Sequence, residues 1–222
     1  RDPLSMACAQ KSVTEAYPER FLLGIGVSHQ AAVEGLRGHT YGPPLQMMRS
    51  YLDGMDAGFY FATPPTTPTH RVLAALGPKM LELAATRAEG AHPYFVPVEH
   101  TAVAREAMGP DAGLYVEQMV VLDTDPTTAR ATARAGMAMY LGLPNYTNNL
   151  RRLGWTEEDI ADGGSDRLVD AIVVWGDEDT IADRVRAHRD AGADHVCVQV
   201  LTPGFTDLPL DGWRRLAPAL ID

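Results

Sequence analysis

The stretch "RVLAALGPKMLELAATRAEG", residues 71–90, predicts a strand that turns into a helix with almost no connection between them. Proline suits the first turn of a helix, and glycine lets a ligand approach the backbone. A helix start beside a lysine also attracts anions, because free N–H groups and the positive end of the helix dipole lie there. The join at Gly77-Pro78-Lys79 is therefore either a plain strand-to-helix turn with a solvated lysine, or an anion site. In the second case Lys79 and Met80 would present free N–H groups to the ligand.

Strands and helices alternate on both sides of this join. The apolar runs predict five strands, at residues 20–27, 71–76, 90–97, 113–122 and 194–204. The helical patterns fall at residues 4–17, 43–60, 78–89, 98–109, 125–142, 145–155, 156–163, 166–176, 177–193 and 213–220. The run at 20–27 is almost continuously apolar, which is typical of a strand covered on both faces. The polar residues that follow it, as far as Gly42, read as a loop.

This alternation predicts an α/β protein with a parallel sheet. The sheet could be doubly wound or could belong to a (β/α)8 barrel, and a complete barrel needs eight strands and about 250 residues. With 222 residues, the chain reads as a single domain, residues 1–222. It is either an open five-stranded sheet or the last five units of a barrel whose first three are absent.

The composition excludes several classes of function. The formal net charge is -10, with 19 Lys and Arg against 29 Asp and Glu, and no basic cluster could follow a phosphate backbone, so nucleic acid is not an expected partner. No apolar run approaches the roughly 20 residues of a membrane helix, and no signal segment opens the chain. Two cysteines and seven scattered histidines offer no metal-ligand spacing. We therefore expect a cytoplasmic protein without a membrane partner or a metal site.

A second candidate site follows the strand at 20–27. The segment "GIGVSH", residues 24–29, resembles half of a dinucleotide fingerprint, but the third glycine is missing and no helix starts at once, so a Rossmann site is disfavoured. What remains is a polar pair, Ser28-His29, beyond the carboxyl end of a strand, where α/β enzymes carry their chemistry. The alternative is a loop histidine without a role. The chain has neither a G-x-S-x-G elbow nor a phosphate-binding P-loop.

Four segments together resemble the luciferase-like monooxygenase superfamily, and within it the coenzyme F420-dependent oxidoreductases. They are "ERFLLGIGVSH", "YGPPLQMMRSYLDGM", "AALGPKMLELAATRAEGAHPYFVPVEHTAVAREAMG" and "WGDEDTIADRVRAHRDAGADHVCVQV". They come in the family's order and cover nearly the whole chain. The resemblance implies a TIM-type (β/α)8 barrel whose first three strands are missing from this chain, with the strand at 20–27 as the fourth.

The resemblance also implies roles for individual residues. His29 would be the acid/base residue that faces the cofactor ring, although some relatives have Glu there; an imidazole can still move a proton near neutral pH. The residues expected along the ring's edge are Gly26, Val27 and Ser28. Those expected around the cofactor's phosphate and ribityl chain are Ala75, Leu76, Gly77, Pro78, Lys79 and Met80.

By the same resemblance, the chain is expected to be an oxidoreductase that uses F420 for hydride transfer to or from a small organic substrate. Two alternatives stay open: an FMN-dependent monooxygenase that uses molecular oxygen, and a non-catalytic flavin-binding relative. F420 carries a polyanionic tail, and a chain of net charge -10 offers few basic partners for it. A homodimer is expected from the family. The loops at 28–42 and 143–166, where specificity would lie, carry no readable code for the substrate.

Overall fold

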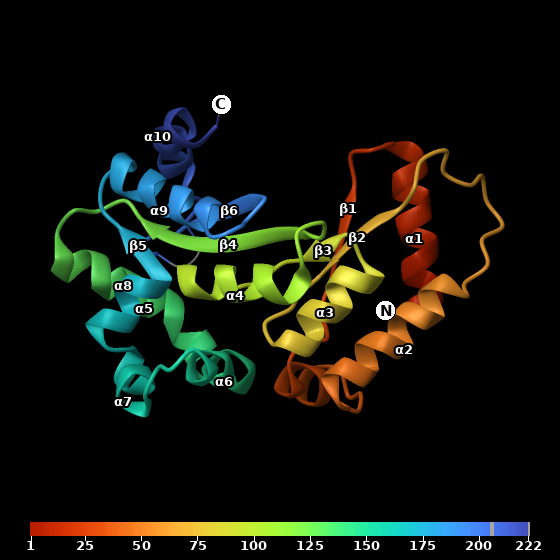
Figure 1. Ribbon diagram of the computed structural model, residues 1–222, viewed down its shortest axis with the longest axis horizontal. Helices are drawn as coiled ribbons and strands as arrows, with labels where there is room; N and C mark the ends of the chain where they lie inside the picture. The colour runs from red at the N-terminus through yellow and green to blue at the C-terminus, as the bar shows by residue number, and fades with distance from the viewer. Residues whose placement is uncertain (205–206, 222) are drawn as a thin grey trace. The chain divides into compact units, whose positions relative to one another are not determined.

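The computed structural model describes residues 1–204 and 207–221. They form two compact units, Arg1–His92 and Pro93–Asp222, which are described separately (Figure 1). Each unit contains a parallel sheet with helices packed against it, as the alternating pattern predicts.

The first unit has three parallel strands in the order β1, β2, β3. Their bounds are Leu22–Ile25, His70–Leu73 and Gly90–Ala91. Ile25 lies opposite Leu73, and Leu73 lies opposite Ala91. The helices are α1 (Pro3–Ala16), the π-helix η1 (Ala31–Leu36), α2 (Pro44–Asp56) and α3 (Pro78–Arg87). The predicted join is therefore the connection between β2 and α3.

Local sequence explains where these helices begin. Asp2 caps α1 by accepting a hydrogen bond from the Ser5 N–H at 2.9 Å. Proline occupies the first turns of α2 and α3, because it lacks only an N–H that a first turn cannot use. Leu52 of α2 and Leu81 of α3 are fully buried, so the hydrophobic faces of these helices form the core of the unit.

An ion-pair network joins β2 to α2 and α3. Arg71 at the start of β2 contacts Asp56 at 2.8 Å, and Arg87 at the end of α3 contacts Asp53 at 2.8 Å and Asp56 at 3.0 Å. These ion pairs lie at the start of β2 and at the end of α3, away from the β2–α3 join. The network therefore helps to hold the strand and the helix that flank the join in one geometry.

The second unit is built around β4 (Gly113–Val121), which pairs in parallel with β5 (Val173–Trp175) and with β6 (His195–Val200). Val120 lies opposite both Val174 and Val200. Its helical segments are α4 (Val98–Met108), α5 (Pro126–Leu141), α6 (Pro144–Arg152), α7 (Glu157–Ile160), the 3-10 helix η2 (Ala161–Gly163), α8 (Asp166–Ile172), α9 (Glu178–Asp190) and α10 (Leu210–Leu220). The predicted strand at 194–204 is shorter in the structure, where β6 ends at Val200.

Four predictions about secondary structure were wrong. The strand predicted at 90–97 forms only at Gly90–Ala91. Residues 173–175, predicted as helix, form β5, because two buried valines pair with β4. The described residues thus hold six strands rather than five. The predicted loop after β1 contains η1. The strand β1 is not covered on both faces in this chain, since Leu22 is 43% exposed.

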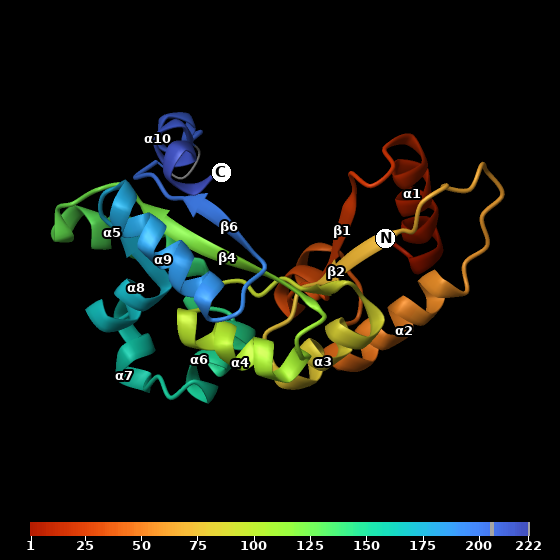
Figure 2. The same ribbon diagram turned by 45° about the horizontal axis from the view of Figure 1, so that its top comes forward.

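The helices α4 and α9 pack against β4 (Figure 2), and buried polar side chains join the three elements. His188 of α9 lies fully buried between Thr101 of α4 and Gln118 of β4, with its two ring nitrogens 2.8 and 2.9 Å from their side-chain oxygens. The Gln118 oxygen can only accept, so Nε2–H donates to it and Nδ1 accepts from the Thr101 hydroxyl. Burial lowers the pKa of His188 to about 4, so this neutral arrangement persists at physiological pH.

Gly192, between α9 and β6, has a φ of 108°, which L side chains rarely adopt. A Cβ there would also lie 2.8 Å from Cγ of Arg105. We expect Gly192→Ala to lower the free energy of unfolding by about 1–3 kcal/mol. Urea denaturation would measure this loss. Gly142→Ala is the control, because Gly142 has a φ of -82°; an equal loss in both variants would contradict the argument.

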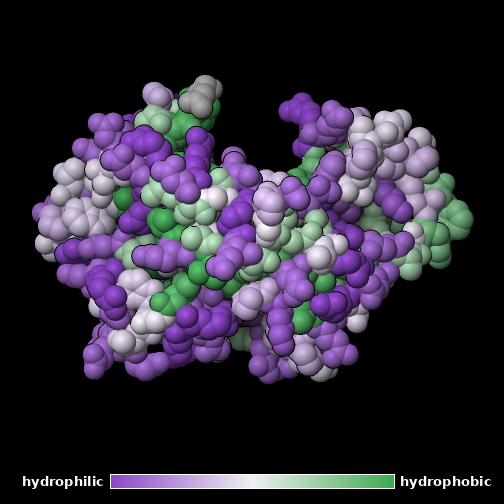
Figure 3. Space-filling view, in the orientation of Figure 1, coloured by the Kyte–Doolittle hydropathy of each residue, from purple (hydrophilic) through white to green (hydrophobic). Residues whose placement is uncertain are grey.

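Apolar surface of the first unit gathers over the connection between α2 and β2, at the right-hand edge of Figure 3. Phe59 and Phe61 lie in this connection with 63% and 92% of their surface exposed. Their rings contact each other at 5.1 Å between centroids. Among the helices of the described residues, none is long and apolar enough to cross a membrane.

Candidate functional site

The carboxyl ends of β1 and β2 bring the two predicted site segments together. The strands are parallel neighbours, and the Ala74 N–H donates to the Ile25 carbonyl at 2.8 Å just where both strands end. Residues 26–29 and 74–80 therefore leave the sheet side by side. In parallel α/β folds this edge is where ligands bind.

Small residues form the first part of this edge. A Cβ built on Gly26 would lie 3.2 Å from Cβ of Ala74, and both residues are exposed. Val27, which follows Gly26, is half-buried. Gly26 and Ala74 thus leave a low, accessible surface that a flat ring could approach. A larger side chain at either position would fill it.

Ser28 and His29 turn the chain away from β1. Ser28 has a φ of 61°, a left-handed conformation that costs a residue other than glycine on the order of 1 kcal/mol. The His29 carbonyl accepts hydrogen bonds from the N–H groups of Ala32 at 3.0 Å and Val33 at 2.9 Å, which start η1. Ser28 and His29 are both half-buried. Such strain in a polar pair at a strand end is common at functional sites.

The start of α3 has the character of an anion site. Gly77 precedes the helix, no side chain caps it, and its first turn contains no acidic residue. Lys79 is exposed, and its N–H has no hydrogen-bond partner within the described residues. The prediction of a free N–H at Met80 was wrong: Met80 and Leu81 both donate to the Gly77 carbonyl, at 3.0 Å each.

Gly77 has a φ of -85° and a ψ of 155°, which any residue can adopt. Backbone conformation therefore does not require glycine here, and space for a close approach is the physical reason that remains. Pro78 is exposed beside it, and Leu76 and Met80 are half-buried. Ala75 is 3% exposed, so its side chain lies in the core and only its backbone could reach a ligand.

These features fit the cofactor that the sequence implies. A phosphate would meet a helix start without a capping side chain, next to an exposed lysine. A flat ring would meet the small residues Gly26 and Ala74, and His29 follows Gly26 by three positions.

Tyr41 belongs to the same edge, and the sequence reasoning missed it. Its hydroxyl donates to the Ser28 carbonyl at 3.1 Å, across 13 residues of a segment read only as loop. Burial raises the pKa of this phenol, so it keeps its proton at neutral pH. A single tyrosine just before "GPP" was the available signal, and it does not by itself predict the contact.

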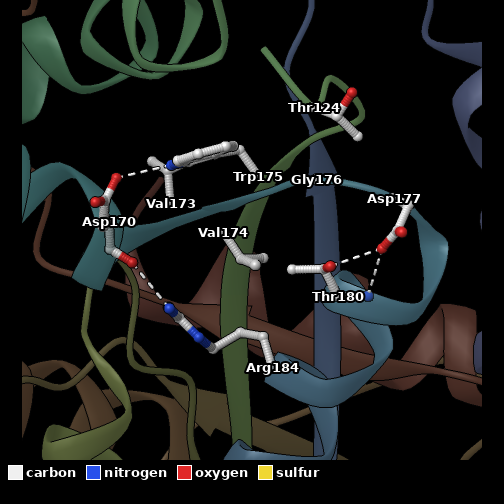
Figure 4. Close-up of a pocket in the computed structure, with 9 residues that line it drawn as sticks. All are labelled: Thr124, Asp170, Val173, Val174, Trp175, Gly176, Asp177, Thr180 and Arg184. Atoms are coloured by element: carbon white, nitrogen blue, oxygen red, sulfur yellow. Dashed lines mark hydrogen bonds between the residues drawn. The ribbon is translucent and has the colours of Figure 1, made fainter. Parts of the chain in front are cut away.

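The second unit has a cavity of about 470 Å³ beside β5 and α9 (Figure 4). Charged side chains that line it bond within the unit: Asp177 accepts from the N–H and the hydroxyl of Thr180, and Arg184 donates to the carbonyls of Asp170 and Ala171. These contacts cap the start of α9 and the end of α8. The bonds of Asp177 and Arg184 therefore have a structural explanation without a ligand.

A buried carboxyl group lies on β4. Glu117 is 4% exposed; its Oε2 accepts from the Phe95 N–H at 3.2 Å, and its Oε1 has no partner in the described part of the chain. Burial raises the pKa of Glu117 to about 7. Nearby, the Tyr94 hydroxyl donates to Gln199 at 2.6 Å and lies 2.8 Å from that of Tyr140. The sequence reasoning did not single out Glu117, because a glutamate inside an apolar strand belongs to no motif.

Comparison with known proteins agrees with this reading of the fold. The model of the luciferase-like monooxygenase family matches residues 1–195. A Mycobacterium tuberculosis protein provisionally assigned as a coenzyme F420-dependent oxidoreductase is 24% identical over 269 residues, covering 93% of this chain and 77% of the relative.

Two solved structures show the same fold. An F420-dependent secondary alcohol dehydrogenase, in complex with an F420-acetone adduct, is similar over 99% of this chain and 76% of its own, with a TM-score of 0.73 and 14% identity. The oxygenating constituent of 3,6-diketocamphane monooxygenase from Pseudomonas putida, in complex with FMN, is similar over 100% and 77%, with a TM-score of 0.62 and 15% identity. These likenesses confirm the predicted α/β barrel fold class, with fewer than eight strands among the described residues. Because the family model matches residues 1–195, most of the chain, the chain belongs to the luciferase-like monooxygenase family.

Proposed function

We propose that this protein is an oxidoreductase that binds coenzyme F420 at the carboxyl ends of β1 and β2 and exchanges hydride with a small organic substrate. The observation that carries the proposal is the meeting of two segments at one sheet edge. One segment ends in His29, and the other is the uncapped start of α3 with Lys79. Luciferase-like relatives that use F420 support it.

Each segment has its own task in the proposal. Gly77 lets the phosphate approach the backbone, and Lys79 supplies a positive charge and a free N–H. Gly26 keeps the ring's approach open, since a side chain there would occupy this exposed surface, with its Cβ only 3.2 Å from Cβ of Ala74. His29 holds or delivers the proton that accompanies the redox step. When bound, the deazaflavin supplies the hydride chemistry itself.

FMN is the alternative cofactor, because it too carries a phosphate on a ribityl chain. The likeness to an FMN-bound monooxygenase favours it, as does the net charge of -10, which suits the polyanionic tail of F420 poorly. The curated relative favours F420. We rank F420 first, because the relative assigned to it matches 93% of this chain by sequence.

Titration with F420 and with FMN, followed by ring fluorescence, tests the proposal. We expect saturable binding of F420, and at least tenfold weaker binding to Gly77→Leu, whose side chain would fill the approach to α3; tenfold corresponds to about 1.4 kcal/mol. The leucine can adopt the local backbone angles, so folding should be retained. Gly142→Ala in the second unit is the control. Failure of both cofactors to bind would refute the proposal, and tight binding of FMN alone would establish the alternative.

A further inference from the structure

Ser28, the residue before His29, has an unfavourable backbone conformation, and its carbonyl is bound by a residue 13 positions later. Ser28 has a φ of 61°, and a non-glycine residue keeps such an angle only where its surroundings enforce it. The Ser28 carbonyl belongs to the peptide that leads into His29. Whatever fixes this carbonyl therefore also fixes the direction in which the His29 side chain leaves the backbone.

Tyr41 supplies this contact. Its hydroxyl donates to the Ser28 carbonyl at 3.1 Å, and because burial raises the pKa of the phenol, the hydroxyl remains a donor across the physiological range. In the next peptide, the His29 carbonyl accepts the two N–H groups that start η1. The strained turn is thus restrained both by η1 and by the tyrosine.

Tyr41 is in turn anchored to η1. Its N–H donates to Oε1 of Glu34 at 3.2 Å, and Oε2 of the same carboxylate accepts from the side chain of Gln30 at 2.9 Å. The segment from Ser28 to Tyr41 therefore closes on itself through two hydrogen bonds at Tyr41, one from its backbone and one from its hydroxyl. Without the hydroxyl bond, the strained peptide would be free to relax.

We propose that Tyr41 is a positioning residue that holds His29 in the orientation needed for proton transfer. The inference rests on the proposed function, but the orientation of His29 can be measured without a cofactor. The substitution Tyr41→Phe removes one hydroxyl and keeps the ring. Tyr51→Phe is the matched control, because Tyr51 of α2 also donates to a backbone carbonyl at 3.1 Å, that of Arg1.

The experiment follows the imidazole of His29 by NMR in the full chain labelled at histidine, with the resonance assigned by its loss in His29→Ala. We expect Tyr41→Phe to shift and broaden this resonance, with little change in the thermal midpoint. Tyr51→Phe should leave the resonance in place. Glu34→Ala removes the anchor of the Tyr41 backbone and should move the resonance in the same direction by a smaller amount. If Tyr41→Phe does not fold, Glu34→Ala tests the inference in its place.

Turnover provides the second readout. Misplacement of a catalytic group by about 1 Å can cost up to 100-fold in rate, so we expect Tyr41→Phe to lower turnover about 10- to 100-fold without weakening cofactor binding. In a His29→Ala background it should cost nothing more, because both changes act through one group.

An unchanged His29 resonance in Tyr41→Phe, or additive losses in the double variant, would overturn the inference. A shifted resonance in a protein that binds neither F420 nor FMN would keep the inference about position and refute the proposed function.

Discussion

Replacing His29 by alanine is expected to lower turnover by about 10²- to 10⁴-fold, the usual contribution of a general acid or base, while cofactor affinity changes by less than about twofold. The reason is that His29 follows the strand end, whereas the phosphate would be held by the start of α3, on the other segment. Cofactor affinity is measured by fluorescence titration. Turnover is followed by the absorbance of F420 with a panel of small secondary alcohols and ketones.

His39→Ala is the matched control for this substitution. His39 is exposed in the same segment, and its bond to Val33 comes from its backbone N–H and survives the change. It should therefore keep full turnover. If His29→Ala lost affinity and turnover to the same extent, the division of roles between the two segments would be wrong, and full activity in His29→Ala would remove the histidine from the mechanism.

The sequence was enough to predict the local structure around the candidate site. Pro78 and Gly77 locate the start of α3 to the residue, because proline restricts the backbone in a way that depends on no distant neighbour. The end of β1 was predicted within two residues, since the apolar run of a strand gives way there to Ser28 and His29. The parallel pairing of β1 with β2 in the structure then brings the two segments together.

The rest depends on contacts between residues far apart in sequence. The bond from Tyr41 to Ser28 spans 13 residues, and no periodicity encodes it. Residues 173–175 have a pattern that fits a buried helix or a buried strand, and pairing with β4 decides between them. A single sequence carries no signal for such pairing, so these features needed the structure.

Glu117→Gln is expected to stabilise the protein at neutral pH. The folded state raises the pKa of this carboxyl from 4.5 to about 7, chiefly by burial. Below pH 4.5 the group is protonated in both states and costs nothing. As the pH rises from 4.5 to 7, the unfolded chain loses the proton while the folded chain keeps it, so stability falls by about 1.4 kcal/mol per pH unit, reaching about 3 kcal/mol.

Glutamine cannot ionise and has nearly the same shape, and its oxygen can still accept the Phe95 N–H that Glu117 binds at 3.2 Å. We therefore expect the variant to exceed the native protein by about 2–3 kcal/mol in free energy of unfolding at pH 8, and by much less at pH 4.5. Urea denaturation at the two pH values measures this difference. Glu106→Gln, at an exposed position of α4, controls for the change in net charge. A gain of the same size at both pH values would mean that packing, rather than the cost of ionising a buried carboxyl, accounts for it.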